Sequence, residues 1–196
     1  MEFRLTYADK LLAHRDDDRL PERSHHVHDI RRVFHKQLKL LWQVHPVLTK
    51  SSEAYTGPQP GDEVRFSIEG FTFIPIVTNA LSLICKLDVL LLREGNPGQV
   101  LFDIDNRLKT LFDALRMPRG PEELGQSTKR GIRKPESDES PFYVLLENDN
   151  LITHVSVTSD RLLEPIPNVS KNEAVRLVIN VTVRGYDVHM DNLGFT

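Results

Sequence analysis

The sequence predicts an α+β fold in which helices pack on a mixed β-sheet. Three observations lead to this prediction. Two segments carry apolar residues at the spacing of a helix, and the segments between and after them read as strands. The chain has 196 residues, of which 39% are hydrophobic, so it is long enough to bury one full core. We therefore expect a single domain over 1–196, with a long loop insertion at 117–141.

The first helix is expected at 29–42, because its apolar residues recur every three or four positions and Pro46 follows shortly after them. Basic residues are interleaved with the apolar ones, so the face that points to solvent should be positively charged. The apolar set is Ile30, Val33, Phe34, Leu38, Leu41 and Trp42, and the basic set is Arg31, Arg32, Lys36 and Lys39.

Two extended segments follow, at 64–77 and 80–93, and their succession suggests a hairpin. A strand at 99–105 should lead directly into the second helix, whose apolar positions are Leu108, Leu111, Phe112 and Leu115. Two further strands are expected at 151–158 and 174–184. Loops are predicted at 14–24, 49–62 and 117–141, where charged residues or Gly and Pro replace the apolar period.

Composition excludes several classes of protein. The single cysteine, Cys85, lies in an apolar run, so a disulfide within the monomer is impossible and a buried, inert thiol is expected. No apolar run approaches the length of a membrane span, and residues 1–7 do not resemble a secretory signal, so we expect a cytoplasmic protein. The net charge is −3, which does not by itself indicate nucleic-acid binding, although 23–39 and 116–134 are locally basic.

The most informative motif is an Asp-x-Asp pair at the end of the expected strand at 99–105. Asp103 and Asp105 would share one face of that strand, and two carboxylates held side by side suit Mg²⁺ or Mn²⁺. Lys109 lies one helical turn after Asp105 and can return toward the same place. The alternative is structural: Asp105 or Asn106 caps the helix and Lys109 pairs with Asp113.

A third carboxylate is available before the strand at 151–158. The apolar run at 145–146 ends in an acidic tip that contains Glu147 and Asp149. Either residue could complete a metal site with Asp103 and Asp105.

These residues resemble the RusA family of Holliday junction resolvases. The resemblance rests on Asp103-x-Asp105-Asn106-x-x-Lys109, on the Asp113-Ala114-Leu115 that follows, and on the acidic tip that ends at Asp149 before a strand. It covers about 100–115 and 143–158, and the strand at 174–184 agrees in order. The long loop at 117–141 and the slightly acidic charge depart from the family pattern.

The resemblance implies a homodimer with a RusA-like mixed α/β fold that cuts branched DNA by Mg²⁺-dependent hydrolysis of phosphodiester bonds. It implies that Asp103, Asp105 and Asp149 bind the metal and that Lys109 is a catalytic lysine. The chemistry is consistent, because a metal can activate water and offset charge on the scissile phosphate.

Positive side chains near this motif are candidate DNA contacts. They are Arg31, Arg32 and Lys36 on the first helix, and Lys129, Arg130, Arg133 and Lys134 in the long loop. Four histidines at 25, 26, 28 and 35 match no standard zinc spacing. A second hypothesis is a nucleic-acid-binding or assembly subunit that keeps the resolvase scaffold within a larger DNA-processing or defence complex and docks through the 117–141 loop.

Overall fold

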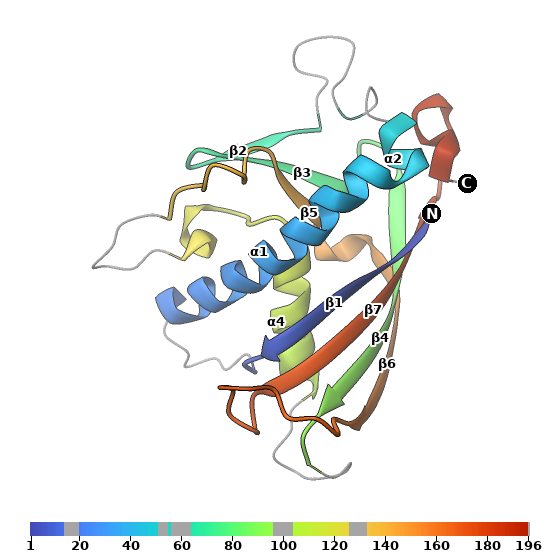
Figure 1. Ribbon diagram of the computed structural model, residues 1–196. Helices are drawn as coiled ribbons and strands as arrows, with labels where there is room; N and C mark the ends of the chain where they lie inside the picture. Colours follow the sequence, from blue (N-terminus) through green and yellow to red (C-terminus); the bar gives the residue numbers. More distant parts are fainter. Residues whose placement is uncertain (14–19, 51–54, 56–63, 96–103, 126–132, 196) are drawn as a thin grey trace.

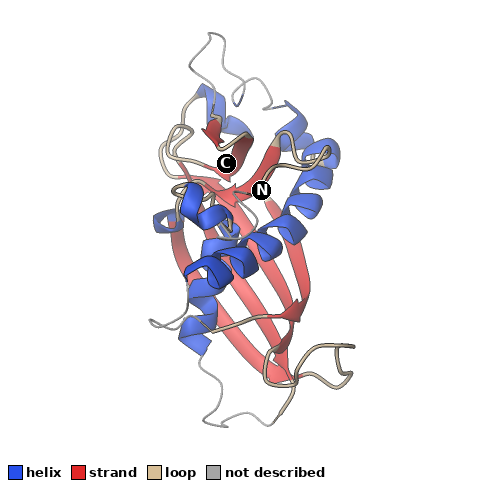
Figure 2. Cartoon of the chain, turned by 90° about the vertical axis from the view of Figure 1, so that its left-hand side faces the viewer, coloured by secondary structure: helices blue, strands red, loops and turns tan. Residues whose placement is uncertain are grey.

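The computed structural model describes residues 1–13, 20–50, 55, 64–95, 104–125 and 133–195. Within these residues the chain forms two mixed β-sheets, with helices packed against them (Figures 1 and 2). The α+β class is therefore confirmed, whereas the expected single sheet is replaced by two.

The larger sheet has the strand order β1-β7-β4-β6. Its strands are β1 (Glu2–Lys10), β7 (Ala174–Gly185), β4 (Leu83–Arg93) and β6 (Ile152–Arg161). Strand β7 pairs antiparallel with both β1 and β4, and β4 pairs parallel with β6. Side chains alternate along β4, so that Leu87 and Val89 are buried while Lys86 and Asp88 are exposed on the other face. One face of this sheet thus forms the core and carries the helices.

The smaller sheet has the order β2-β3-β5, with β2 (Phe66–Ile68), β3 (Phe71–Val77) and β5 (Phe142–Leu146). Strands β2 and β3 form a hairpin whose two loop residues, Glu69 and Gly70, have φ of 49° and 85°. Positive φ at both positions is typical of a type I′ turn. The expected hairpin between 64–77 and 80–93 is wrong, because β3 and β4 belong to different sheets.

Helix α1 (Leu20–Val44) contains the whole helix expected at 29–42 and extends beyond it at both ends. Its apolar side chains Ile30, Phe34 and Leu38 are buried in the main core, as the period predicts. Gln37 covers the open edge of β1: its side-chain amide donates to Thr6 O (2.7 Å) and accepts from Thr6 N (2.9 Å). The helix therefore replaces a neighbouring strand at that point of the edge.

Helix α4 (Ile104–Leu115) confirms the second expected helix. It buries Arg107, Thr110, Leu111, Ala114 and Leu115, a spacing that places one continuous face against the core. Residues 99–103 of the strand expected at 99–105 lie outside the described residues. Ile104 and Asp105 belong to the first turn of the helix, so the strand cannot extend to 105.

Three strands of the larger sheet can be compared with the expectations. The strands expected at 151–158 and 174–184 are confirmed as β6 and β7, whereas β1 was not expected. The 117–141 insertion contains the 3-10 helix η1 (Pro121–Leu124). The other short elements are α2 (Pro46–Lys50), η2 (Asp149–Leu151) and η3 (Met190–Phe195).

Two further expectations concern burial and membranes. Cys85 is fully buried, and burial raises the pKa of its thiol to about 12, which agrees with an inert thiol. None of the helices in the described part of the chain is long and apolar enough to cross a membrane.

Candidate metal and nucleic-acid site

The first two turns of α4 bring together two predicted site residues, Asp105 and Lys109, with Asn106 of the same motif. Lys109 Nζ donates to Asn106 Oδ1 at 3.1 Å and lies 3.8 Å from Asp105 Oδ2. The Asp105 and Lys109 side chains are 76% and 57% exposed. Such an exposed ion pair contributes little to stability, about 0–1 kcal/mol, so both charged groups can engage a ligand at small cost. Lys109 therefore lies beside Asp105, and not beside Asp113 as the structural alternative expects.

Asp103, the other half of the Asp-x-Asp pair, lies outside the described residues. Within the described residues, no group of three or more His, Cys, Asp or Glu side chains could hold a metal ion. Asp105 nonetheless fits one common type of Mg²⁺ site, in which one or two carboxylates bind the ion together with waters and substrate phosphates.

The acidic tip at 147–149 divides its two carboxylates between different contacts. Glu147 accepts hydrogen bonds from Thr78 Oγ1 (2.5 Å) and from Asn79 N (2.9 Å), so it fixes the turn between β3 and β4. Asp149 accepts from Arg119 Nη2 at 3.3 Å, and its side chain is 38% exposed. Of the two candidate ligands, Glu147 thus accepts two of these hydrogen bonds and Asp149 accepts one.

The structure does not bring Asp149 to Asp105. The Arg107 guanidinium, in the first half of α4, donates to Leu11 O and Asn172 O, next to the end of β1 and the start of β7. The η2 helix that contains Asp149 instead leads into β6 at Ile152, which pairs with Cys85.

Helix α4 gives the scale of this separation. Asp105 lies in its first turn, whereas Arg116, just after its last residue, bridges to Leu146 before the acidic tip, and η2 contacts α4. Eleven helical residues rise about 16 Å. Asp105 and Asp149 therefore lie toward opposite ends of α4, and a three-carboxylate site with both of them does not form within one chain.

The predicted DNA contact at Arg31 is wrong, because this side chain is fully buried. Its Nε donates to Arg116 O (3.0 Å) and its Nη2 donates to Asp113 O (2.7 Å). These carbonyls close the C-terminal end of α4, so Arg31 fastens α1 to α4 and cannot reach a phosphate. Burial lowers its pKa to about 10, and the guanidinium therefore stays charged at neutral pH.

Arg32 and Arg133 are engaged by the part of the insertion that we call the strap, residues 133–140. The Arg32 guanidinium contacts Glu136 Oε1 (2.7 Å) and Glu139 Oε1 (2.8 Å), and Arg133 pairs with Asp29 (2.7 Å). Lys39 Nζ adds a hydrogen bond to Asp138 O (2.5 Å). The strap thus lies along the basic face of α1 and neutralises the charge of Arg32.

The other predicted DNA contacts remain open. Lys36 and Lys134 are exposed, while Lys129 and Arg130 lie outside the described residues. Trp42 is half-buried and packs against Tyr55 and Tyr143, with ring centroids at 4.7 and 5.4 Å, which supports its expected place beside the core.

The histidines of α1 also serve packing. His28 is fully buried against Phe71 and Phe142, and burial together with the Arg31 charge lowers its pKa to about 2. His35 Nδ1 accepts from Tyr143 N at 2.8 Å, which ties α1 to β5.

Asp113, the acid of the Asp-Ala-Leu motif, is the centre of a charged network that sequence reasoning did not assign. Its carboxylate accepts from Arg23 Nη2 (2.6 Å) and Arg116 Nη2 (2.6 Å). Arg116 also donates to Glu123 Oε2 (2.8 Å), and these contacts lower the pKa of Glu123 despite its burial. The i, i+3 spacing of Asp113 and Arg116 was the only sequence signal of this network.

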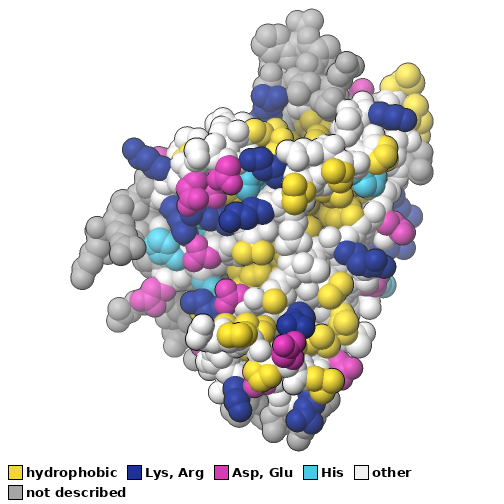
Figure 3. All heavy atoms as spheres, viewed as in Figure 1, with side chains coloured by type: hydrophobic (Ala, Val, Ile, Leu, Met, Phe, Trp, Pro, Cys, Tyr) yellow, Lys and Arg dark blue, Asp and Glu magenta, His cyan; other side chains and the backbone are white. Residues whose placement is uncertain are grey.

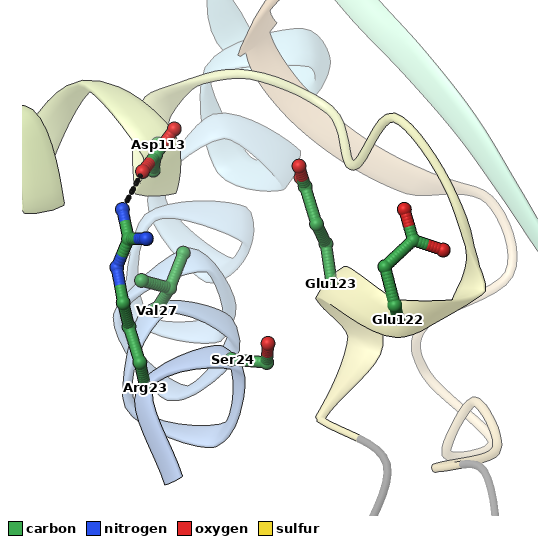
Figure 4. Close-up of a pocket in the computed structure, with 6 residues that line it drawn as sticks. All are labelled: Arg23, Ser24, Val27, Asp113, Glu122 and Glu123. Atoms are coloured by element: carbon green, nitrogen blue, oxygen red, sulfur yellow. Dashed lines mark hydrogen bonds and ion pairs between the residues drawn. The ribbon is translucent and has the colours of Figure 1, made fainter. Parts of the chain in front are cut away.

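A pocket of about 170 Å³ borders this network, between α1, the end of α4 and η1 (Figure 4). Arg23 and Asp113, which both line the pocket, point toward each other and form an ion pair. Glu123, another lining residue, is paired with Arg116. Its charged groups are thus largely used in holding three elements together. We assign this pocket a structural role.

Comparisons with known proteins add no further constraint. No family model matches the chain, and no curated protein and no solved structure matches it.

Proposed function

We propose that the protein is a metal-dependent, structure-selective endodeoxyribonuclease that hydrolyses phosphodiester bonds in branched DNA, as its resemblance to RusA resolvases implies. The observation that carries the proposal is the cluster of Asp105, Asn106 and Lys109 on the exposed side of the first two turns of α4. These are the described members of the Asp103-x-Asp105-Asn106-x-x-Lys109 motif, the part of the resemblance that carries the proposed chemistry.

In this proposal Asp103 and Asp105 hold Mg²⁺ or Mn²⁺ together with waters and a substrate phosphate. The ion supplies Lewis-acid activation of the phosphodiester. Asn106 positions the Lys109 ammonium through the 3.1 Å hydrogen bond, and the ammonium offsets negative charge that develops on the phosphate oxygens. Asp149 of the same chain takes no part, because it lies beside the other end of α4.

The test is cleavage of matched four-way junctions, forks, flaps and linear duplexes with Mg²⁺, with Mn²⁺ and with chelator. We expect nicking of branched DNA by the wild type and none by Asp105→Asn, while Asp149→Asn keeps cleavage. The absence of nicking under every metal, from folded wild type, would refute the proposed function.

Loss of cleavage in Asp149→Asn would show that this residue reaches the site from a second copy in a homodimer. Mixing the Asp105→Asn and Asp149→Asn proteins checks this outcome, because a site shared between copies regains activity in the mixed dimer. The homodimer itself is part of the proposal, since two sites related by a two-fold axis suit a branched substrate with two strands to cut.

The second candidate is a nucleic-acid-binding or assembly subunit of a cytoplasmic DNA-processing complex. Exposed apolar side chains near the end of α1 and in η3 favour it, with Val44 73% and Met190 83% exposed. Such side chains are visible at the upper right of Figure 3. Contiguous exposed apolar surface often marks a contact with another protein. Binding of branched DNA without cleavage would favour this candidate.

A further inference from the structure

A second cavity lies at the end of the larger sheet where β4 and β6 finish and β7 begins. It has a volume of about 430 Å³, and its lining includes Glu94, Arg161, Leu163, Lys171 and Asn172. Figure 1 shows this end of the sheet at the bottom of the view, below α4. We call this cavity the basic pocket.

The charge of the basic pocket favours an anion. Arg161 is the last residue of β6 and Lys171 lies just before β7, so two separate segments each direct a cation to the same cavity. Both residues are exposed. Glu94 offsets one of the two charges, which leaves a net positive lining. Figure 3 shows Lys and Arg side chains at this lower end of the molecule.

The walls of the pocket are held by hydrogen bonds, so its cations are presented from a fixed frame. Leu162 N donates to Arg93 O at 2.7 Å and joins the ends of β6 and β4. Ala174 N donates to Ser170 O at 2.8 Å, which closes the turn that carries Lys171. The backbone positions that carry the two cations are thus fixed, while their exposed side chains are free to adjust to a ligand.

The basic pocket lies near the same end of α4 as the candidate catalytic cluster. Arg107 Nη2 donates to the carbonyl of Asn172, a lining residue, at 2.6 Å. Two positions along a helix are about 200° apart, so the buried Arg107 points to the opposite face of α4 from the exposed Asp105 and Lys109. The pocket and the cluster therefore lie on opposite sides of the first half of α4.

We propose that the basic pocket binds a backbone phosphate of the DNA, at a distance from the phosphate that is cut, through Arg161 and Lys171. The inference rests on the proposed function for its ligand. Arg and Lys contacts to phosphates fix the register of a protein on DNA and carry no sequence information. The pocket would thus position the strand so that one particular phosphodiester reaches Asp105 and Lys109.

The experiment measures binding of a fluorescein-labelled four-way junction by anisotropy across a KCl series, with chelator present to prevent cleavage. The variants are Arg161→Ala, Lys171→Ala and the double variant. Lys86→Ala is the control, because Lys86 is also basic and exposed. It lies on the face of β4 opposite to that of Arg93, the residue that pairs with Arg161. Thermal unfolding verifies that every variant is folded.

Each alanine variant is expected to bind about 3–10-fold more weakly at moderate salt and to reduce the slope of log K against log salt by about 1. The double variant should reduce the slope by about 2. Arg161→Lys and Lys171→Arg should bind nearly as the wild type does, because they keep the charge. A folded double variant with an unchanged slope would overturn the inference.

A methylphosphonate scan locates the phosphate. Replacing single phosphates of the junction by uncharged methylphosphonates should weaken wild-type binding at the contacted position and leave the double variant insensitive there. Equal sensitivity of both proteins at every position would also overturn the inference. Failure of the proposed function would look different. If the wild type does not cleave DNA but the variants still bind more weakly than it does, the basic pocket is the DNA contact of a non-catalytic protein.

Discussion

Replacing Asp113 by Ala should destabilise the protein by about 2–3 kcal/mol. The carboxylate neutralises Arg23 and Arg116, whose side chains are only 25% and 4% exposed. Removing one partner of a buried ion pair costs about 3–5 kcal/mol, and we reduce this range because Asp113 is itself 21% exposed and Arg116 keeps Glu123. Arg31 adds to the cost, because it is a buried cation in the same network.

The assay is urea unfolding at neutral pH, with thermal unfolding as a second measure. For a chain of this size the loss corresponds to a decrease in Tm of about 4–12 °C. Asp88→Ala is the matched control, because Asp88 is 54% exposed and lies 4.0 Å from its nearest cation-forming partner, His154. The control should change stability by no more than about 0.5 kcal/mol. Equal stability of the two variants would refute the reasoning.

Three further predictions concern other contacts. Burial lowers the pKa of His26 to about 4, so between about pH 6.5 and 4 the unfolded chain binds a proton that the folded protein does not. The unfolding free energy should therefore drop by about 1.4 kcal/mol per pH unit for this group over that range. The His26→Gln side chain can still accept a hydrogen bond from Leu12 N. Urea unfolding at pH 7, 6 and 5 should show that its unfolding free energy falls less steeply with decreasing pH than that of the wild type. An identical decline in both proteins would contradict the assignment. Arg32→Ala should release the strap and increase its cleavage in limited proteolysis at least several-fold, whereas Arg32→Lys should do so less, and equal protection in all three proteins would argue against the Arg32 clasp. Gln37→Ala exposes the backbone of Thr6 on the edge of β1 and should cost about 1 kcal/mol in urea unfolding, while an unchanged midpoint would mean that water replaces the amide without loss.

Elements in which apolar residues repeat regularly over many positions were predictable from the sequence. Helices α1 and α4 and strand β7 were expected near their observed positions, because burial of one face leaves a repeating apolar pattern. The hairpin between 64–77 and 80–93 failed for a nonlocal reason: neither segment records which sheet it joins. Strand β1 was missed because it lies at an edge and carries charged residues such as Glu2, Arg4 and Lys10.

The candidate site was predictable only where its residues are close in sequence. Asp105, Asn106 and Lys109 lie on one helical turn, so their spacing was sufficient to associate them. Arg31 was assigned to the exposed face because the carbonyls that bind it belong to Asp113 and Arg116, more than 80 residues away. The separation of Asp149 from Asp105 depends on where η2 enters the larger sheet, which no local pattern records.

The central position of β7 has a consequence for the order of events during synthesis. Strand β7 lies between β1 and β4, and Glu2 pairs with Thr182 across nearly the whole chain. At 5–20 residues per second, about 10–35 s separate the synthesis of these two residues. Until β7 is made, its two neighbours in the larger sheet, β1 and β4, lack the strand that joins them. Folding of this sheet on the ribosome must therefore wait for β7.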